Sequence, residues 1–172
     1  MNQVANARKS MERSIKLRPG CSILIIEARF YEDVSDELFE GARKELDFHN
    51  VKYTRVAVPG ALEIPLVLSA AIAEGMIPRS ADHARYCGAV VLGCVIKGET
   101  SHYDIVCHNA NHWIMEQAIR HSIPLGNGIL TVDTKKQAME RAQGGRHGKG
   151  AAAVHACLKL IELQREFEEQ GA

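Results

Sequence analysis

Four short segments with the apolar pattern of β-strands recur along this chain of 172 residues. Residues 21–28 and 87–96 are almost continuously apolar, which is typical of parallel strands covered on both faces. Residues 51–58 alternate between apolar and polar positions, and residues 128–132 form another short apolar run. The pattern therefore predicts a sheet of four strands.

Between these strands, apolar residues repeat at helical spacing. One helix is predicted after the first strand, through Val34 and Leu46, and another from Asp104 onward. Residues 63–74 are apolar at so many positions that we expect this helix to be buried on more than one side. Further helices are predicted at residues 134–143 and 150–168, on either side of the glycine-rich residues 144–148.

The order of these elements indicates an α/β fold. Each strand is followed by a helix, so helices should pack on both faces of a parallel sheet. We expect a three-layer αβα sandwich with a four-stranded parallel sheet in the flavodoxin-like order 2-1-3-4. Residues 21–172 are predicted to form a single domain. Residues 1–18 carry five Lys or Arg against one Glu, and we expect residues 1–20 to be a mobile or partner-contacting arm.

Composition narrows the classes of partner and compartment. The chain has 21 basic and 21 acidic residues, so no overall basic field favours nucleic acid or an anionic membrane. A small molecule or another protein is the expected partner. The five cysteines form no CxxC pair, and no 18-residue apolar stretch or signal peptide is present in this sequence. We therefore expect reduced thiols and a cytoplasmic location.

The loops after the four predicted strands carry the candidate chemistry. In open parallel α/β sheets, ligands bind beyond the carboxyl ends of the strands. These loops contain an aromatic residue, a glutamate at a helix start, a glycine-containing turn and a histidine. They lie at residues 29–31, 59–63, 97–103 and 133–134. We expect them to converge on one crevice.

The loop after the third strand combines two kinds of chemistry. Gly98 begins a turn that leads into a helix, whose first N–H groups can bind a phosphate or carboxylate. His102 follows at the end of this loop, where an imidazole can accept and donate protons. The residues alone leave a simpler explanation open, in which Thr100 or Ser101 only caps the helix and His102 is an exposed loop residue.

Five ordered segments of the chain resemble the signatures of the lumazine synthase family. The resemblance extends from about residue 21 to residue 163 and leaves only the termini uncovered. The matching segments are residues 28–30, 58–65, 93–102, 128–131 together with 137–142, and 149–150.

This resemblance implies a transferase of riboflavin biosynthesis. Members of the family condense 5-amino-6-(D-ribitylamino)uracil with 3,4-dihydroxy-2-butanone 4-phosphate to give 6,7-dimethyl-8-ribityllumazine, with release of phosphate and water. The reaction is the penultimate step of riboflavin synthesis. No metal or organic cofactor is expected, because the substrates already contain the amine, the carbonyl and the leaving group.

The resemblance also implies which residues would bind each substrate. His102 would carry the proton transfers. Contacts to the pyrimidine and its ribityl chain are implied for Phe30, Gly60, Ala61, Glu63, Cys94, Val95, Ile96, Asn127 and Lys149. Contacts to the phosphate are implied for Gly98, Glu99, Thr100 and Arg141.

Several of these positions have ordinary structural explanations as well. Phe30 could be a core residue, Glu63 could complement the positive end of a helix, and Arg141 could be a solvated cation. The chain also departs from the family pattern. Tyr31 stands where the family usually has Asn, Lys97 where Arg is common, Asn127 where many members have Phe, and Gly148 where Asn is usual.

The resemblance further implies a homo-oligomer with active sites between subunits. The family forms pentamers or multiples of them, including icosahedral shells, so Asn127, Arg141 and Lys149 would reach the crevice of a neighbouring chain. Riboflavin synthase is a candidate protein partner.

Three other kinds of function stay open on the residues alone. His108 and His112, four residues apart on a predicted helix, could bind a metal, although no third ligand is evident. The fold also suits a flavin- or nucleotide-binding electron carrier. A non-catalytic pyrimidine-binding or shell-forming paralogue is the remaining alternative.

Overall fold

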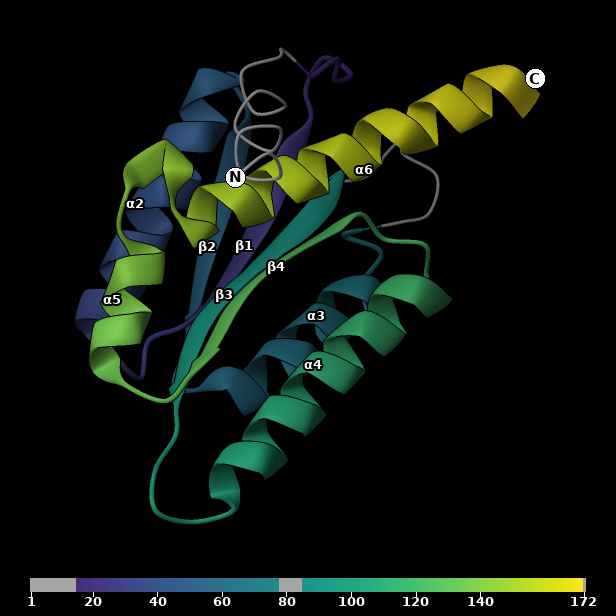
Figure 1. Ribbon diagram of the computed structural model, residues 1–172. Coiled ribbons are helices and arrows are strands. Elements are labelled where there is room, and N and C mark those ends of the chain that lie inside the picture. The colour runs from purple at the N-terminus through teal and green to yellow at the C-terminus, as the bar shows by residue number, and fades with distance from the viewer. Residues whose placement is uncertain (1–14, 78–84, 172) are drawn as a thin grey trace.

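The computed structural model describes residues 15–77 and 85–171 (Figure 1). Strands and helices alternate along the chain, as the apolar pattern predicts. In chain order the elements are β1 (Ser22–Ala28), α2 (Glu32–Phe48), β2 (Lys52–Val58), the 3₁₀ helix η1 (Ala61–Glu63), α3 (Ile64–Ala73), β3 (Gly88–Ile96), α4 (His102–Arg120), β4 (Leu125–Val132), α5 (Lys135–Ala142), the 3₁₀ helix η3 (Gly145–His147) and α6 (Lys149–Gly171).

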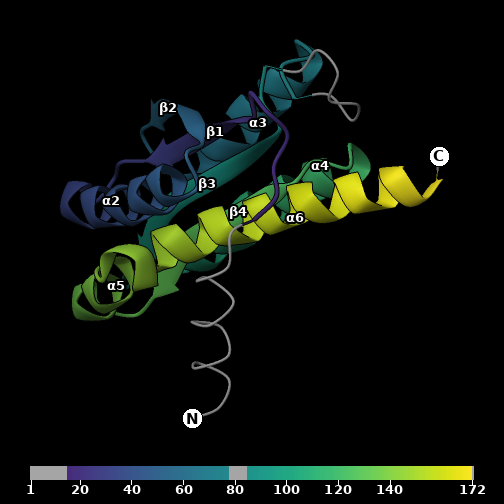
Figure 2. The same ribbon diagram turned by 90° about the horizontal axis from the view of Figure 1, so that it is seen from above.

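The four described strands form one parallel sheet in the order β2-β1-β3-β4. Ile23 of β1 lies opposite Tyr53 of β2 on one side and Gly88 of β3 on the other. Helices α2, α5 and α6 cover one face of the sheet, and α3 and α4 cover the other (Figures 1 and 2). The predicted three-layer sandwich and its flavodoxin-like strand order are confirmed.

Alternate residues of β1 supply the two apolar layers. Ile23 and Ile25 point into the cluster beneath α2 and α6, whereas Leu24 and Ile26 point into the cluster beneath α3 and α4. All four side chains are almost completely buried. The continuous apolar run at residues 21–28 therefore reflects a central strand covered on both faces.

Two elements begin two or more residues from their predicted starts. Strand β4 begins at Leu125, three residues before the predicted start, because Gly126 lies inside the strand where α6 comes close. A Cβ atom on Gly126 would lie 1.9 Å from the carbonyl oxygen of Ala153. Helix α4 begins at His102 rather than at Asp104, so the loop after β3 is shorter than expected.

The expectation that residues 63–74 are buried on more than one side is wrong for the single chain. Helix α3 turns Ile64 and Leu68 toward the sheet, but its outer side stays uncovered, and Leu66 is 69% exposed. The neighbouring helix α4 likewise exposes Trp113 and Ile119. Large apolar residues on this side of the molecule are therefore in contact with solvent, which is characteristic of an interaction surface.

The described part of the N-terminal segment lies against α6. Ile15 is buried in the core, the backbone N–H of Lys16 donates to Glu162 Oε1 at 2.9 Å, and Arg18 pairs with Glu168. Most of the predicted arm, residues 1–14, lies outside the described residues, so the division of the chain into arm and domain remains a prediction. None of the described helices combines the length and apolar character needed to cross a membrane.

Helices α2 and α6 approach each other through glycine. A Cβ atom on Gly150 would lie 1.8 Å from the backbone oxygen of Leu38. A Cβ atom on Gly41 of α2 would lie 3.3 Å from the backbone nitrogen of Ala151 in α6, and 2.9 Å from the oxygen of Gly145 in η3. Because the atoms in the way belong to the backbone, a larger residue would push the two helices apart.

We therefore expect Gly150→Ala to destabilise the protein by about 3 kcal/mol or more, at the upper end of the range for overpacked positions. The measurement is the midpoint of thermal or urea unfolding. Gly171→Ala is the matched control, because nothing lies within 4 Å of a Cβ atom at that position. Equal midpoints for the two variants would show that α2 and α6 do not pack this closely.

Candidate functional site

A pocket of about 410 Å³ opens at the carboxyl ends of β1, β2 and β3. Its volume is in the range of pockets that hold one small organic molecule. Three of the four predicted loops meet there, whereas the fourth, at Asp133 and Thr134, does not line it. The lining residues are Phe30, Tyr31, Pro59, Gly60, Ala61, Leu62, Glu63, Cys94, Val95, Ile96, Gly98, Thr100, His102, Tyr103 and Val106.

Phe30 offers an open aromatic face to this pocket. Its side chain is 71% exposed, so the alternative explanation as a core residue fails. Its ring meets the ring of Tyr31 edge to face, with centroids 5.0 Å apart. The preceding Arg29 fixes the loop, because its guanidinium donates to Glu27 at 3.2 Å and to Asp36 at 2.9 Å. The exposed ring therefore stands on an anchored loop.

The loop after β2 brings backbone and a carboxylate to a second side of the pocket. Gly60 is extended, and a Cβ atom there would lie 3.1 Å from Glu63 Oε2, so the carboxylate sits directly over the glycine. Glu63 is the residue before α3 and makes no capping hydrogen bond with its side chain. Its oxygens can therefore accept hydrogen bonds from a ligand in the pocket.

The end of β3 forms the third side. Cys94, Val95 and Ile96 line the pocket with the strand itself, and burial raises the pKa of the Cys94 thiol to about 11. This thiol is therefore protonated at neutral pH and supplies no thiolate nucleophile.

Helix α4 points its amino end at the pocket. Gly98 and Thr100 line the pocket just before the helix, whereas Glu99 does not. The N-cap residue Ser101 makes no side-chain capping bond, so the first backbone N–H groups of α4 are not occupied by its hydroxyl. Free N–H groups and the positive end of the helix dipole together favour an anion at this position.

His102 is the first residue of α4, and its side chain is exposed along the pocket wall. The next residue, Tyr103, also lines the pocket and was not among the predicted site residues. Burial raises the pKa of the Tyr103 phenol, so it remains protonated and able to donate a hydrogen bond. The sequence pattern placed the start of this helix at Asp104, two residues too late. With the correct start, Tyr103 lies in the first turn of α4 and would have been a candidate for the pocket wall.

Three of the predicted site residues lie elsewhere on the chain. Asn127, Arg141 and Lys149 line a second hollow of about 350 Å³, between the edge strand β4 and helix α6. No residue lines both hollows. Within residues 15–77 and 85–171, no carboxylate pairs with Arg141 or Lys149, and the Arg141 guanidinium donates only to the backbone oxygen of Gln137, at 3.0 Å. The second hollow thus presents two uncompensated cations.

Hydrogen bonds hold the side chain of Asn127 in place. Its Nδ2 donates to Asn111 Oδ1 of α4 at 2.8 Å, and its Oδ1 accepts from the backbone N–H of Ile129 at 3.0 Å. The amide therefore lies along the exposed edge of the sheet, where β4 has no neighbouring strand in the described chain.

The alternative metal pair, His108 and His112, does not gather a third ligand among the described residues. Both histidines are exposed on α4. The described residues that do group as candidate ligands are Glu45, His49 and His155, and none of these three lines either hollow.

Comparison with known proteins gives a consistent assignment. A model of the 6,7-dimethyl-8-ribityllumazine synthase family matches residues 20–165. Proteins named 6,7-dimethyl-8-ribityllumazine synthase from Afipia carboxidovorans and Methylorubrum populi are 44% and 42% identical to the chain. The matches cover 86% and 94% of this chain, and 88% and 91% of those relatives. A 6,7-dimethyl-8-ribityllumazine synthase 1 from Rhizobium meliloti is 45% identical over 88% of this chain and 96% of its own length. This chain therefore belongs to the 6,7-dimethyl-8-ribityllumazine synthase family.

Proposed function

We propose that this protein condenses 5-amino-6-(D-ribitylamino)uracil with 3,4-dihydroxy-2-butanone 4-phosphate to form 6,7-dimethyl-8-ribityllumazine. The observation that carries the proposal is the pocket at the strand ends. It places an exposed aromatic ring, a carboxylate, a helix amino end and a histidine around a space that suits one small organic product. Family membership supports the same reaction.

The pyrimidine and its ribityl chain suit one half of the pocket. The heterocycle stacks on the exposed face of Phe30, where an aromatic contact is favourable. The polar edge of the ring faces the backbone of Val95 and Ile96 at the end of β3. Glu63 accepts hydrogen bonds from the ribityl hydroxyls, and Gly60 lets the ligand approach the backbone closely.

The butanone phosphate suits the other half. Gly98 and Thr100 lie where the first N–H groups of α4 are directed, and a Cβ atom at Gly98 would meet nothing within 4 Å. A phosphate there gains hydrogen bonds from the backbone N–H groups and electrostatic stabilisation from the helix dipole. The carbonyl of the bound butanone phosphate then lies near the amine of the pyrimidine. Much of the rate comes from orienting the two substrates.

His102 serves as the acid–base group. The amine attacks the ketone, the carbinolamine loses water to give an imine, phosphate leaves, and the enol tautomerises before ring closure. Each of these steps moves a proton, and His102 is the imidazole on the pocket wall. The protonated phenol of Tyr103 beside it offers a further hydrogen-bond donor.

The phosphate site is completed by a second copy of the chain in this proposal. Arg141 and Lys149 carry charges suited to a phosphate but line the other hollow. Exposed apolar residues on α3 and α4 and the open edge of β4 supply surfaces for such contacts. A heterologous contact repeated from chain to chain closes into a ring, and we propose a pentamer or a multiple of it, up to an icosahedral shell.

The cellular setting follows from the same proposal. All five cysteines are unpaired, and Cys21, Cys94 and Cys157 are buried, which supports a reducing, cytoplasmic environment. Riboflavin synthase remains a candidate partner, because it would consume the product. The non-catalytic alternative, a shell-forming or flavin-binding paralogue, is supported only by the same exposed apolar faces and lacks a use for His102.

The direct experiment mixes the two substrates with purified protein and follows the fluorescence of the lumazine product. Product formation far above the uncatalysed rate supports the proposal that the protein catalyses this condensation. Tight binding of flavin or pyrimidine without product formation would instead support the non-catalytic paralogue.

Replacing His102 tests the proton-transfer role. We expect His102→Ala to lower kcat by roughly 10²-fold or more, the usual scale for a positioned acid–base group, with the assembly unchanged. His112→Ala, a change on the same helix outside the pocket, is the control. Wild-type turnover in His102→Ala would remove this imidazole from the mechanism.

Mixing two inactive variants tests the shared site. His102→Ala and Arg141→Ala are each expected to lose activity when assembled alone. When equal amounts are unfolded and reassembled together, about a quarter of the sites combine an intact His102 with an intact Arg141 from the neighbouring chain. Steady-state turnover should therefore recover to roughly that fraction. No recovery in mixed assemblies of normal size would place both residues in one chain's site.

A further inference from the structure

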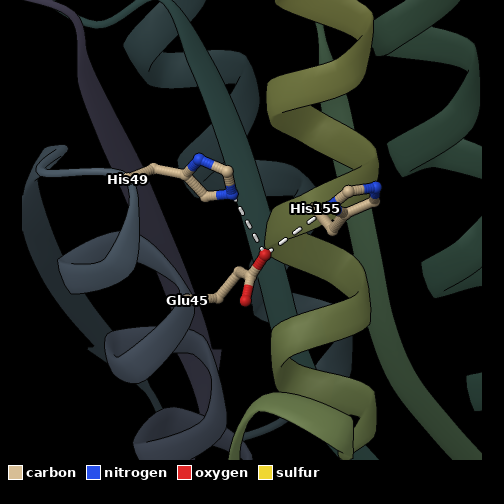
Figure 3. Close-up of side chains that lie close together, drawn as sticks. All are labelled: Glu45, His49 and His155. Carbon is tan, nitrogen blue, oxygen red and sulfur yellow. Dashed lines mark hydrogen bonds and ion pairs between the residues drawn. The ribbon is translucent and has the colours of Figure 1, made fainter. Parts of the chain in front are cut away.

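A cluster of three metal-ligand side chains lies between the first and last helices that cover one face of the sheet. Glu45 lies in the last turn of α2, His49 is the residue that caps this helix, and His155 faces them from α6 (Figure 3). None of the three lines either hollow described above. The proposed condensation therefore gives this cluster no role.

The distances between the donor atoms resemble those of a zinc site. Glu45 Oε1 lies 3.2 Å from His49 Nε2 and 3.5 Å from His155 Nδ1 (Figure 3). All three donor atoms lie within 4.8 Å of one another. Ligands about 2.0–2.1 Å from a tetrahedral zinc ion are separated from each other by roughly 3.3 Å. Two of the three separations already fit, and the third, between the two imidazole nitrogens, is at most 4.8 Å.

The low exposure of the three candidate ligands and their positions on packed elements also suit a bound ion. The Glu45 side chain is fully buried and that of His49 is 2% exposed, whereas His155 is 15% exposed. The ligands are thus held at the end of α2 and within α6, and the partly exposed side of His155 leaves access for an ion and a water molecule. Ligands on packed helices keep their geometry better than ligands on loops.

Arg146 limits which ion can bind. Its Nε donates to the other carboxylate oxygen, Glu45 Oε2, at 2.7 Å, and its guanidinium stacks on Phe48 at 3.5 Å from the ring centroid. This contact orients the carboxylate so that Oε1 faces the imidazoles, as hydrogen bonds to ligating carboxylates commonly do. The nearby positive charge also repels a cation. Only an ion that bonds strongly to imidazole nitrogen overcomes this repulsion, which favours zinc over Mg²⁺ or Ca²⁺.

We propose that Glu45, His49 and His155 bind a divalent transition-metal ion, with Zn²⁺ as the expected ion and water as the fourth ligand. The ion would join α2 to α6 next to η3, the short helix that precedes Lys149. Its role is structural: it would hold together two helices that are separated by more than half of the chain. The competing explanation is an ion-free cluster in which Arg146 and the two imidazoles simply satisfy a buried carboxylate.

Metal titration separates these explanations. The purified full-length protein is treated with EDTA, dialysed, and titrated with Co²⁺ as a spectroscopic probe and then with Zn²⁺. We expect one ion per chain, visible absorption bands typical of four-coordinate Co²⁺ with imidazole ligands, and loss of these bands when Zn²⁺ displaces Co²⁺. Zn²⁺ should also raise the midpoint of thermal unfolding.

Two matched variants locate the ion. His155→Gln changes the most exposed of the three ligands and should weaken binding at least tenfold, because ligand loss has a larger effect than changes in supporting residues. His112→Gln, which removes the exposed His108–His112 pair, should bind as the wild type does. Each variant is first checked for wild-type size and lumazine formation.

Three results would overturn the proposal: no stoichiometric binding by the wild type, equal binding by His155→Gln, or loss of binding in His112→Gln. If His155→Gln does not assemble, X-ray absorption on the Zn²⁺-loaded wild type decides, because the proposal requires two imidazole ligands and oxygen ligands around the ion. Lumazine formation that persists after metal removal is expected, so failure of this site leaves the proposed reaction untouched.

Discussion

The parallel pairing of β1 with β3 at the centre of the sheet determines where every part of the candidate site lies. Because β1 pairs with β2 in register up to Ala28 opposite Val58, the loops that carry Phe30 and Gly60 leave the sheet side by side. Strand β3 extends past the end of β1, since Glu27 is opposite Leu92 while β3 continues to Ile96. The projecting end of β3 forms the wall against which the two loops face. The pocket is thus a consequence of strand register.

The same arrangement explains why the proposed phosphate site is incomplete in a single chain. Backbone N–H groups at the start of α4 can bind an anion, but a phosphate in water also requires compensating cations for tight binding. The two uncompensated cations, Arg141 and Lys149, lie on the other side of β4, at the edge of the sheet. Exposed apolar residues on α3 and α4 provide the surface on which another copy can pack. Assembly and catalysis are therefore linked in the proposed function, because association brings the charges to the anion.

The sequence predicted the sheet and most of the pocket because both depend on local patterns. Continuous apolar runs identified the central strands, and position after a strand identified Phe30, Glu63 and His102. The failures have a different origin. The fourth strand was predicted to begin at residue 128, whereas Gly126 lies inside β4 and allows α6 to approach it, and such close contact between distant segments leaves no local signal. The outer side of α3 was expected to be buried because a high apolar content alone does not show which sides of a helix pack against the rest of the chain.

The Glu45, His49 and His155 cluster marks the same limit. Glu45 and His49 have the spacing of neighbours on a helix, but His155 lies on the last helix, and only the packing of α2 against α6 brings it near. His108 and His112 had the more suggestive spacing in the sequence, yet they face outward without a third ligand among the described residues. Spacing along one helix indicates which residues share a face of that helix. A metal site also depends on which residues of other helices pack against this face.

The most direct test of the account is a structure of the assembled protein with inorganic phosphate bound. The account predicts that the phosphate contacts the backbone N–H groups near Gly98 and Thr100 of one chain and the guanidinium of Arg141 from its neighbour. A phosphate bound at the start of α4 with every Arg141 remote from it would contradict the shared site. A protein that remains monomeric at the concentrations where it is active would contradict it equally.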